Sequence, residues 1–208
     1  MKRFALVTGI LSGFLFGIAT PFSKLLLEGL NSFQLAGLLY LGAALATMPH
    51  LFRKNSSLQL LFMPGSRAKT AGIIFFGGFA GPLLLLAGLK TAYASSVSIW
   101  LNMELVATAV LGVLLFKDAL DRNTWIGVAL TILAGVVTSF GEGASGLTSA
   151  LLVTGACICW AIDNHLTALS DGALPQTVTF VKGLVAGSVN LLIGMMISSR
   201  AMEIGNVA

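Results

Sequence analysis

The apolar positions of this chain form long runs that short polar loops separate. Runs occupy residues 96–116 and 124–140, and the loop between them contains Lys117, Asp118, Asp121 and Arg122. The first run is long enough to cross the roughly 30 Å hydrocarbon core of a bilayer, and the second needs its polar flanks to reach the interface. Similar runs cover residues 33–52, 70–90, 147–169 and 177–198. Each run predicts one membrane-spanning helix.

The N-terminal run has two interpretations, because Met1-Lys2-Arg3 followed by an apolar stretch also begins a secretory signal peptide. The stretch continues to Leu27, which is longer than a signal core, and no small-x-small cleavage site closes it. We interpret it as a first spanning helix. The pattern therefore predicts an all-α polytopic membrane protein of seven transmembrane helices, without a soluble domain.

Composition supports this class. Hydrophobic residues make up 56% of the chain and charged residues 10%, and the mean hydropathy is +0.93, outside the usual range of soluble domains. Cys157 and Cys159 are two residues apart in an apolar run, so they point to different sides of a helix and cannot form a disulfide with each other.

The basic residues predict the orientation of the chain in the membrane. A cytoplasmic N-terminus places only Lys24, Lys90 and Arg200 outside. The larger group falls on the inner side, as the positive-inside rule expects: Lys2, Arg3, Arg53, Lys54, Arg67, Lys69, Lys117 and Arg122. We expect an integral protein of the bacterial cytoplasmic (inner) membrane. The basic residues form no groove with interleaved aromatic residues, so nucleic acid is not expected as a partner.

Small residues and prolines predict how the helices pack. Small residues recur at a spacing of four, which lets helix backbones approach closely, in four sets: Gly9, Gly13 and Gly17; Gly77 and Gly81; Gly127, Thr131, Gly135 and Ser139; Gly183 and Gly187. Static packing is favoured over sliding surfaces. Pro21 and Pro82 lie inside spans and are expected to kink them or to free backbone carbonyls that a cavity can use.

The chain contains a weak internal repeat. A shift of about 144 residues aligns Phe16-Gly17-Ile18-Ala19-Thr20 with Trp160-Ala161-Ile162-Asp163-Asn164. Because five spans separate the copies, the second copy crosses the membrane in the opposite sense. Inverted repeats are typical of secondary transporters, whose substrate site lies at the repeat interface near the midplane.

These features resemble the drug/metabolite transporter (DMT) superfamily, in its EamA-type branch. Trp160-Ala161 matches the step that opens each repeat of that family, and Phe16-Gly17 departs from it conservatively. Glu104, Asp118, Gly127 and Gly135 fit the pattern of the fourth and fifth helices, whereas Leu105 replaces a proline and Lys117 a loop glycine. The second helix commonly carries an arginine, and the matching position is Leu39.

The resemblance implies ten helices in two inverted five-helix repeats, with both termini cytoplasmic. Residues 1–140 then form the first EamA-like repeat and residues 147–208 an incomplete second repeat. Residues 202–208 are expected to lead into an eighth helix. We therefore expect that the 208-residue chain does not transport alone unless two chains associate as a homodimer.

Glu104 is the first candidate site residue, because it lies close to the membrane midplane, about 13 Å into its span. A carboxyl group there is costly and should face the bundle interior or a watery cavity. It serves either as a proton or substrate site or as a partner in a helix–helix hydrogen bond. Trp100, four residues earlier, is expected on the same face, where it walls a cavity or packs. Asn102 is expected to face elsewhere.

Asp163 and Lys182 are the second candidates. Asp163 lies about 8 residues before the turn at residues 171–175 and Lys182 about 7 residues after it, so a hairpin places both at similar depth. We expect a buried ion pair with a gating or substrate/proton role. The alternatives are a purely structural clamp and a Lys182 side chain that extends to the inner interface. Asn164 and His165 are further candidates for the substrate or proton pathway.

No cofactor is expected. Cys157, Cys159, Asp163 and His165 do not converge on one helical face, so no metal site is predicted, and no catalytic motif is present. The first hypothesis is a secondary transporter that moves a small organic metabolite or drug-like solute by alternating access. The alternatives are a membrane-embedded enzyme that uses Glu104 or Asp163 as acid or base, and a non-transporting helical subunit.

Overall fold

The structure is a computed structural model that describes residues 2–52, 58–170 and 172–205. Helices make up 87% of it, and no strand occurs in these ranges. The sequence-based prediction of an all-α chain with seven long apolar helices is confirmed. The helices that are long and apolar enough to cross a membrane are Leu6–Leu26, Ser32–Phe52, Arg67–Thr91, Ala94–Phe116, Arg122–Gly141, Gly146–Ala168 and Pro175–Ser199.

Several of these spans consist of more than one helical segment. The unbroken α-helices are α1 (Lys2–Leu26), α8 (Arg122–Gly141), α9 (Gly146–Ala168) and α10 (Pro175–Gly205). The second span is α2 (Ser32–Thr47) with the 3-10 turn η1 (Met48–Phe52); the short α3 is Leu58–Leu61, and the 3-10 turn η4 is Gly143–Ser145. The third span is α4 (Arg67–Gly72), the π-helical η2 (Ile73–Ala80) and α5 (Gly81–Thr91). The fourth is α6 (Ala94–Trp100), α7 (Met103–Leu111) and the π-helical η3 (Gly112–Phe116).

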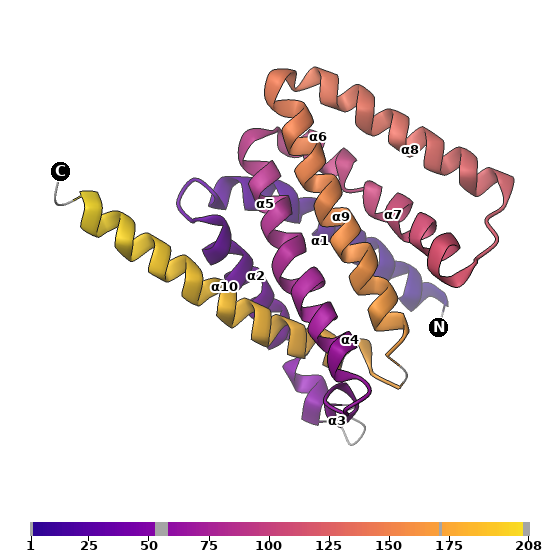
Figure 1. The fold of residues 1–208 in the computed structure, drawn as a ribbon, viewed down its shortest axis with the longest axis horizontal. Coiled ribbons are helices and arrows are strands. Elements are labelled where there is room, and N and C mark those ends of the chain that lie inside the picture. Colours follow the sequence, from indigo (N-terminus) through magenta and orange to yellow (C-terminus); the bar gives the residue numbers. More distant parts are fainter. Residues whose placement is uncertain (1, 53–57, 171, 206–208) are drawn as a thin grey trace.

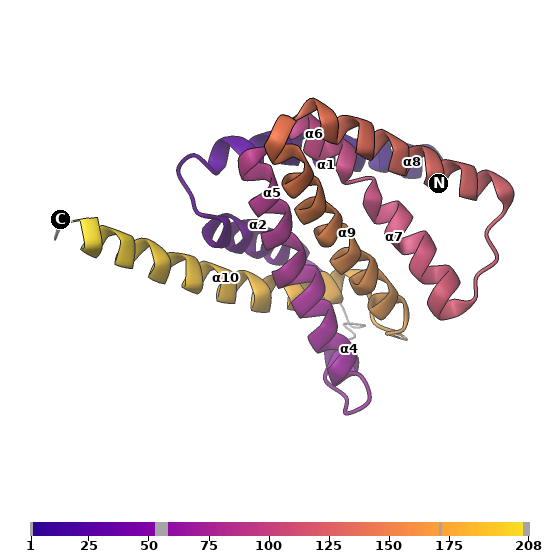
Figure 2. The same cartoon turned by 45° about the horizontal axis from the view of Figure 1, so that its top comes forward.

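The helices are arranged around α5 and α9, which lie side by side in the centre of the bundle (Figures 1 and 2). Helix α10 packs along α2 and then extends away from the bundle toward the C-terminus (Figure 1). Helix α8 packs against α6, α7 and α9. Helix α1 contacts the bundle mainly through α6 and α5, and most of its apolar side chains are exposed.

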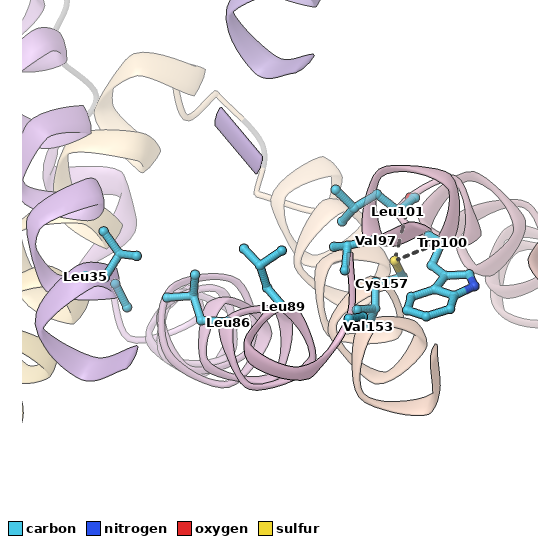
Figure 3. Packing of buried hydrophobic residues seen from close by; sticks show 10 residues of the cluster. Leu35, Leu86, Leu89, Val97, Trp100, Leu101, Val153 and Cys157 are labelled. Atoms are coloured by element: carbon cyan, nitrogen blue, oxygen red, sulfur yellow. Dashed lines mark hydrogen bonds between the residues drawn. The ribbon is translucent and has the colours of Figure 1, made fainter. Parts of the chain in front are cut away.

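The principal buried cluster joins α2, α5, α6 and α9. Figure 3 shows that Val97 and Trp100 of α6 lie beside Val153 and Cys157 of α9. Burial of apolar side chains against one another fixes these helices, because dispersion contacts favour close packing in the interior. The buried members are Leu35, Ala36, Leu86, Leu89, Ala92, Val97, Trp100, Leu101, Val153 and Cys157.

The close glycine contacts that the sequence predicts form in only part of the bundle. A Cβ atom on Gly183 would lie 2.5 Å from the Tyr40 carbonyl oxygen, and one on Gly187 would lie 2.9 Å from Leu41. These glycines therefore let α10 approach α2. The prediction is wrong for Gly9, Gly13 and Gly17 of α1 and for Gly127 of α8, because a Cβ atom at any of these positions would meet no neighbouring atom within 4 Å.

Two lysines connect helix ends that are distant in sequence. Lys24 Nζ, near the end of α1, donates to the carbonyl oxygens of Leu89 (2.7 Å) and Lys90 (2.9 Å) in the last turn of α5. Lys69 Nζ of α4 donates to Leu169 O (2.7 Å) at the end of α9. A cation at a helix C-terminus satisfies free carbonyls and interacts favourably with the helix dipole. These contacts tie α1 to α5 and α4 to α9.

Helix α8 begins at a side-chain cap. The Asp121 carboxylate accepts a hydrogen bond from Thr124 N (3.0 Å) and another from the Thr124 hydroxyl. These bonds, the hydroxyl one first, lower the pKa of the exposed Asp121 carboxyl below its usual value. The polar loop after the fourth span therefore ends at Asp121, which caps the N-terminus of α8.

The last helix runs past the seventh candidate span. Helix α10 continues to Gly205, whereas the candidate span ends at Ser199. Residues 206–208 lie outside the described part, as do Arg53 and Lys54 of the predicted inner loop. Pro21 lies within α1, which continues as one helix through it.

Candidate functional site

The fourth span is interrupted near its middle, which corrects the prediction of one continuous helix over residues 96–116. Helix α6 ends at Trp100 and α7 begins at Met103. The Asn102 side-chain amide donates to Ser98 O (3.3 Å) and Ile99 O (3.0 Å). Asparagine side chains compete in this way with the helical backbone pattern, and the Glu104 N–H accordingly bonds to Leu101 O, three residues back (3.1 Å).

The interruption places Glu104 in the first turn of α7. A negative charge in the first turn of a helix is favoured by the helix dipole. Asn164 Nδ2 of α9 donates to Glu104 Oε1 at 3.0 Å. Glu104 has no ion-pair partner among the side chains that the structure describes. The carboxylate is thus oriented by an amide and stabilised by a helix end, without a neighbouring cation.

Glu104 lines a cavity of about 390 Å³ between α1, α6 and α7. Asn102 lines the same cavity, so the expectation that it faces elsewhere is wrong; the turn at residues 101–102 removes the regular helical spacing on which that expectation rested. The lining residues are Phe16, Gly17, Thr20, Ser98, Leu101, Asn102, Glu104 and Leu105. The cavity therefore has a polar end at the interruption of the fourth span.

A second cavity of about 160 Å³ adjoins the first and shares Phe16, Thr20 and Leu101 with it. It is mostly apolar, and Tyr40 and Trp160 belong to its wall. Its other lining residues are Ala19, Ser23, Leu39, Pro82, Leu85, Leu86 and Leu89. Together the two cavities form a hollow with a carboxylate at one end and aromatic side chains at the other.

Trp100 does not line either of these cavities. Its side chain is 1% exposed, and its Nε1 donates to Gly135 O of α8 at 3.1 Å. The ring lies beside Cys157 (Figure 3), whose sulfur is 3.7 Å from Trp100 O and 3.6 Å from Leu101 O. The expectation that Trp100 shares a face with Glu104 is wrong because the helix is broken between them. Trp100 is a packing residue.

The carbonyl groups before Pro82 are used by side chains from other helices. Proline has no N–H, so Pro82 cannot donate to Gly78 O, four residues back, or to Gly77 O, five residues back. Tyr40 OH and Trp160 Nε1 (3.3 Å) donate to Gly77 O instead. The expected freed carbonyls are therefore present, but packing side chains of α2 and α9 occupy the Gly77 carbonyl, which corrects the idea that a cavity uses it.

Asn190 of α10 takes the same role at the next carbonyl. Its Nδ2 donates to Gly78 O at 3.1 Å, and the residue is fully buried. Asn190 is therefore an interhelical hydrogen-bonding residue. The π-helical segment η2 is thus held from three sides, by α2, α9 and α10.

Asp163 and Lys182 form the buried ion pair that their equal depth predicts. Lys182 Nζ lies 2.5 Å from Asp163 Oδ2, and the side chains are 18% and 6% exposed for Lys182 and Asp163. Thr167 Oγ1 also donates to Asp163 Oδ1 at 3.5 Å. Lys182 therefore does not extend to the interface. The carboxylate lies directly over Gly77, where a Cβ atom would overlap it.

His165 lies on the same helix but turns to α7. Its Nε2 is 3.1 Å from Thr108 O, and its ring centroid is 5.0 Å from that of Phe116. Asn164 contacts Glu104, whereas Asp163 contacts Lys182. The three neighbouring candidates on α9 thus meet three different partners, and only Asn164 joins the cavity residue Glu104.

Sequence reasoning did not find Tyr40 and Phe16 as site residues. Tyr40 places its ring in a cavity wall and its hydroxyl on the Gly77 carbonyl. A tyrosine inside an apolar span is a usable signal, because a buried tyrosine hydroxyl normally finds a hydrogen-bond partner. Phe16 has a different signal, because the internal alignment pairs it with Trp160, and both residues line the smaller cavity.

The fold defines an integral membrane protein of the helical class. The chain matches the model of the EamA-like transporter family over residues 3–140, and it belongs to that family. It is 32% identical over 124 residues to an uncharacterized transporter of Methanothermobacter thermautotrophicus. That match covers 56% of this chain and 36% of the relative, so the chain spans about a third of the length of the curated relative that it matches. No solved structure matches the chain.

Proposed function

We propose that this chain acts in secondary transport and moves a small organic metabolite or drug-like solute by alternating access. The observation that carries the proposal is the cavity of about 390 Å³ at the interruption of the fourth span, with Glu104 and Asn102 in its wall. Cavities of this size hold small molecules. Interrupted helices with polar groups near mid-depth are typical of transporter binding sites.

The candidate residues take distinct roles in this proposal. Glu104 contacts the solute, and Asn164 orients the Glu104 carboxylate through its hydrogen bond. Asp163 and Lys182 form a gate, because their ion pair joins α9 to α10 at the segment η2 and can be broken as a unit. Trp100 joins α6 to α8 through the Gly135 carbonyl, and His165 joins α9 to α7 through the Thr108 carbonyl.

The proposed setting is the cytoplasmic membrane of a bacterium, with the N-terminus inside. The excess of Lys and Arg in the loops assigned to the inner side supports this orientation. A homodimer is the proposed working form, because inverted-repeat transporters build the solute pathway from two structural halves. Two copies would supply helices on both sides of the hollow.

Two other functions serve as alternatives, a membrane-embedded enzyme and a non-transporting subunit. The enzyme is less well supported because the polar partner of Glu104 is Asn164, an amide that does not exchange protons in general acid–base catalysis. The subunit does not explain why a carboxylate lines a cavity. Membership of a transporter family supports the first proposal.

The test is solute flux through proteoliposomes that contain the full chain, with its oligomeric state measured in the same preparation. A panel of neutral, anionic and cationic small solutes is supplied, and saturable uptake supports transport. Glu104→Leu should abolish this uptake, whereas Glu28→Gln, at an exposed turn residue, should not. Chemical turnover of a solute without net uptake would support the enzyme. The absence of both uptake and turnover would favour the subunit.

A further inference from the structure

Two acidic residues lie well inside the spans, and they differ in their electrostatic partners. Asp163 is paired with Lys182 at 2.5 Å. Glu104 accepts one hydrogen bond, from Asn164, and no cation approaches it among the side chains that the structure describes. Charged groups at this depth are costly and normally pair with an opposite charge. Among the described residues, Asp163 has a counter-ion and Glu104 has none.

The surroundings of Glu104 indicate what can approach it. The described residues that line its cavity include no Lys, Arg or His, and they offer hydroxyl and amide groups at Ser98, Thr20 and Asn102. Beyond Phe16, the adjoining cavity is mostly apolar and is walled by Tyr40 and Trp160. The hollow therefore combines one negative charge with an aromatic compartment.

We propose that the solute itself supplies the missing positive charge, and that it is an organic amine with an aromatic or bulky apolar group and no carboxylate. The inference rests on the proposed transport function and names its solute class. The ammonium group binds Glu104, and charge-assisted hydrogen bonds of this kind are among the strongest in proteins. The apolar group occupies the compartment beside Phe16, where aromatic faces also attract cations.

The absence of a carboxylate from the solute follows from the same charges. A free amino acid carries a carboxylate next to its ammonium group, and the described lining of the two cavities has no cation to receive it. Lys182 is not available for this purpose because it is paired with Asp163. Removing a carboxylate from water without a partner is strongly unfavourable. An amine should therefore bind better than the corresponding amino acid.

The experiment uses four probes that share a phenyl group: phenethylamine, phenethyl alcohol, phenylacetate and phenylalanine. Binding to the purified full chain and uptake into proteoliposomes are both measured. We expect phenethylamine to bind and to be taken up, with the other three at least about tenfold weaker, since one charge-assisted hydrogen bond accounts for a factor of that order. Glu104→Gln preserves the acceptor for Asn164 and should reduce this preference about tenfold or more.

Glu28→Gln is the matched control, because it removes the same charge from an exposed position, and it should leave the preference unchanged. Thermal unfolding of each variant confirms that it is folded.

Uptake of the alcohol or of phenylacetate without preference for the amine would overturn the inference and leave the transport proposal intact. If the amine binds but no probe is taken up, the transport proposal would be contradicted and the proposed amine-binding site would be supported. A Glu104→Gln variant that alters only the pH dependence of uptake would assign a proton as the counter-ion and overturn the inference. No binding of any probe would also overturn it.

Discussion

Lys182 of α10 places its ammonium nitrogen 2.5 Å from a carboxylate oxygen of Asp163 on α9, so an ion pair joins the two helices on either side of their connecting turn. The carboxylate also rests against Gly77 of η2. In the internal alignment of the sequence the matching positions are Ala19 and Leu38, and neither can form such a pair. The contact is therefore particular to this part of the chain.

The first prediction is that Asp163 and Lys182 depend on each other. Asp163→Asn or Lys182→Met alone should destabilise the fold by about 3 to 5 kcal/mol, because each leaves one uncompensated buried charge. The double variant should recover part of this loss. Folded yield and thermal unfolding in detergent measure the effect.

Glu28→Gln combined with Lys90→Met provides the control for this cycle. Both residues are exposed, so their changes should be small and additive. Additive losses for Asp163→Asn and Lys182→Met would show that the two charges do not stabilise each other. The proposed gate would then be abandoned.

The second prediction concerns the contact between Gly77 and the ion pair. Gly77→Ala should destabilise the protein by about 1 to 3 kcal/mol, because the added methyl group overlaps a carboxylate that Lys182 holds in place. Gly13→Ala introduces the same methyl group at a position with no atom within 4 Å, and it should be neutral or slightly stabilising. Equal unfolding temperatures for the two variants would contradict the packing described here.

The third prediction is that Tyr40 compensates for the missing N–H of Pro82. Tyr40→Phe should cost about 1 to 3 kcal/mol in the native sequence, because it removes a hydrogen-bond donor from the Gly77 carbonyl. In a Pro82→Ala background the cost should fall, since the substituted residue would provide a backbone donor to this region. A double-mutant cycle of unfolding free energies measures the coupling, and a coupling of zero would show that the two features are independent.

The fourth prediction concerns topology. In a background with Cys157→Ser and Cys159→Ser, we expect Gly65→Cys to react with a membrane-impermeant maleimide only after permeabilisation. Ser145→Cys should react in intact cells. The expectation follows from the basic residues at Arg67 and Lys69, next to the first site. The reverse labelling pattern would show that the chain is inserted with the opposite orientation.

Much of the fold can be predicted from the sequence because membrane helices are determined by length and hydropathy. The ion pair can be predicted as well, because residue counts from a turn fix the depth of Asp163 and Lys182 in adjacent helices. The interruption of the fourth span cannot be predicted from an apolar run. It depends on the Asn102 amide, which bonds to backbone carbonyls of its own helix and not to a distant residue.

The cavity itself is less accessible to prediction. It depends on which helices become neighbours. The small-residue spacing that places α10 on α2 gives the same signal on α1, where a Cβ atom on Gly9 or Gly13 would meet nothing within 4 Å. The Gly77 carbonyl is another such case. Its partners Tyr40 and Trp160 come from helices that are distant in sequence.

Helix α1 supplies Phe16, Gly17 and Thr20 to the wall of the cavity that contains Glu104, and near its C-terminal end Lys24 bonds to the last turn of α5. Most of its remaining surface is exposed. A tilt of α1 about that end would open the hollow laterally into the lipid instead of into water. A solute that entered by this route would come from the bilayer. Its partitioning into lipid would therefore set the concentration that reaches the hollow.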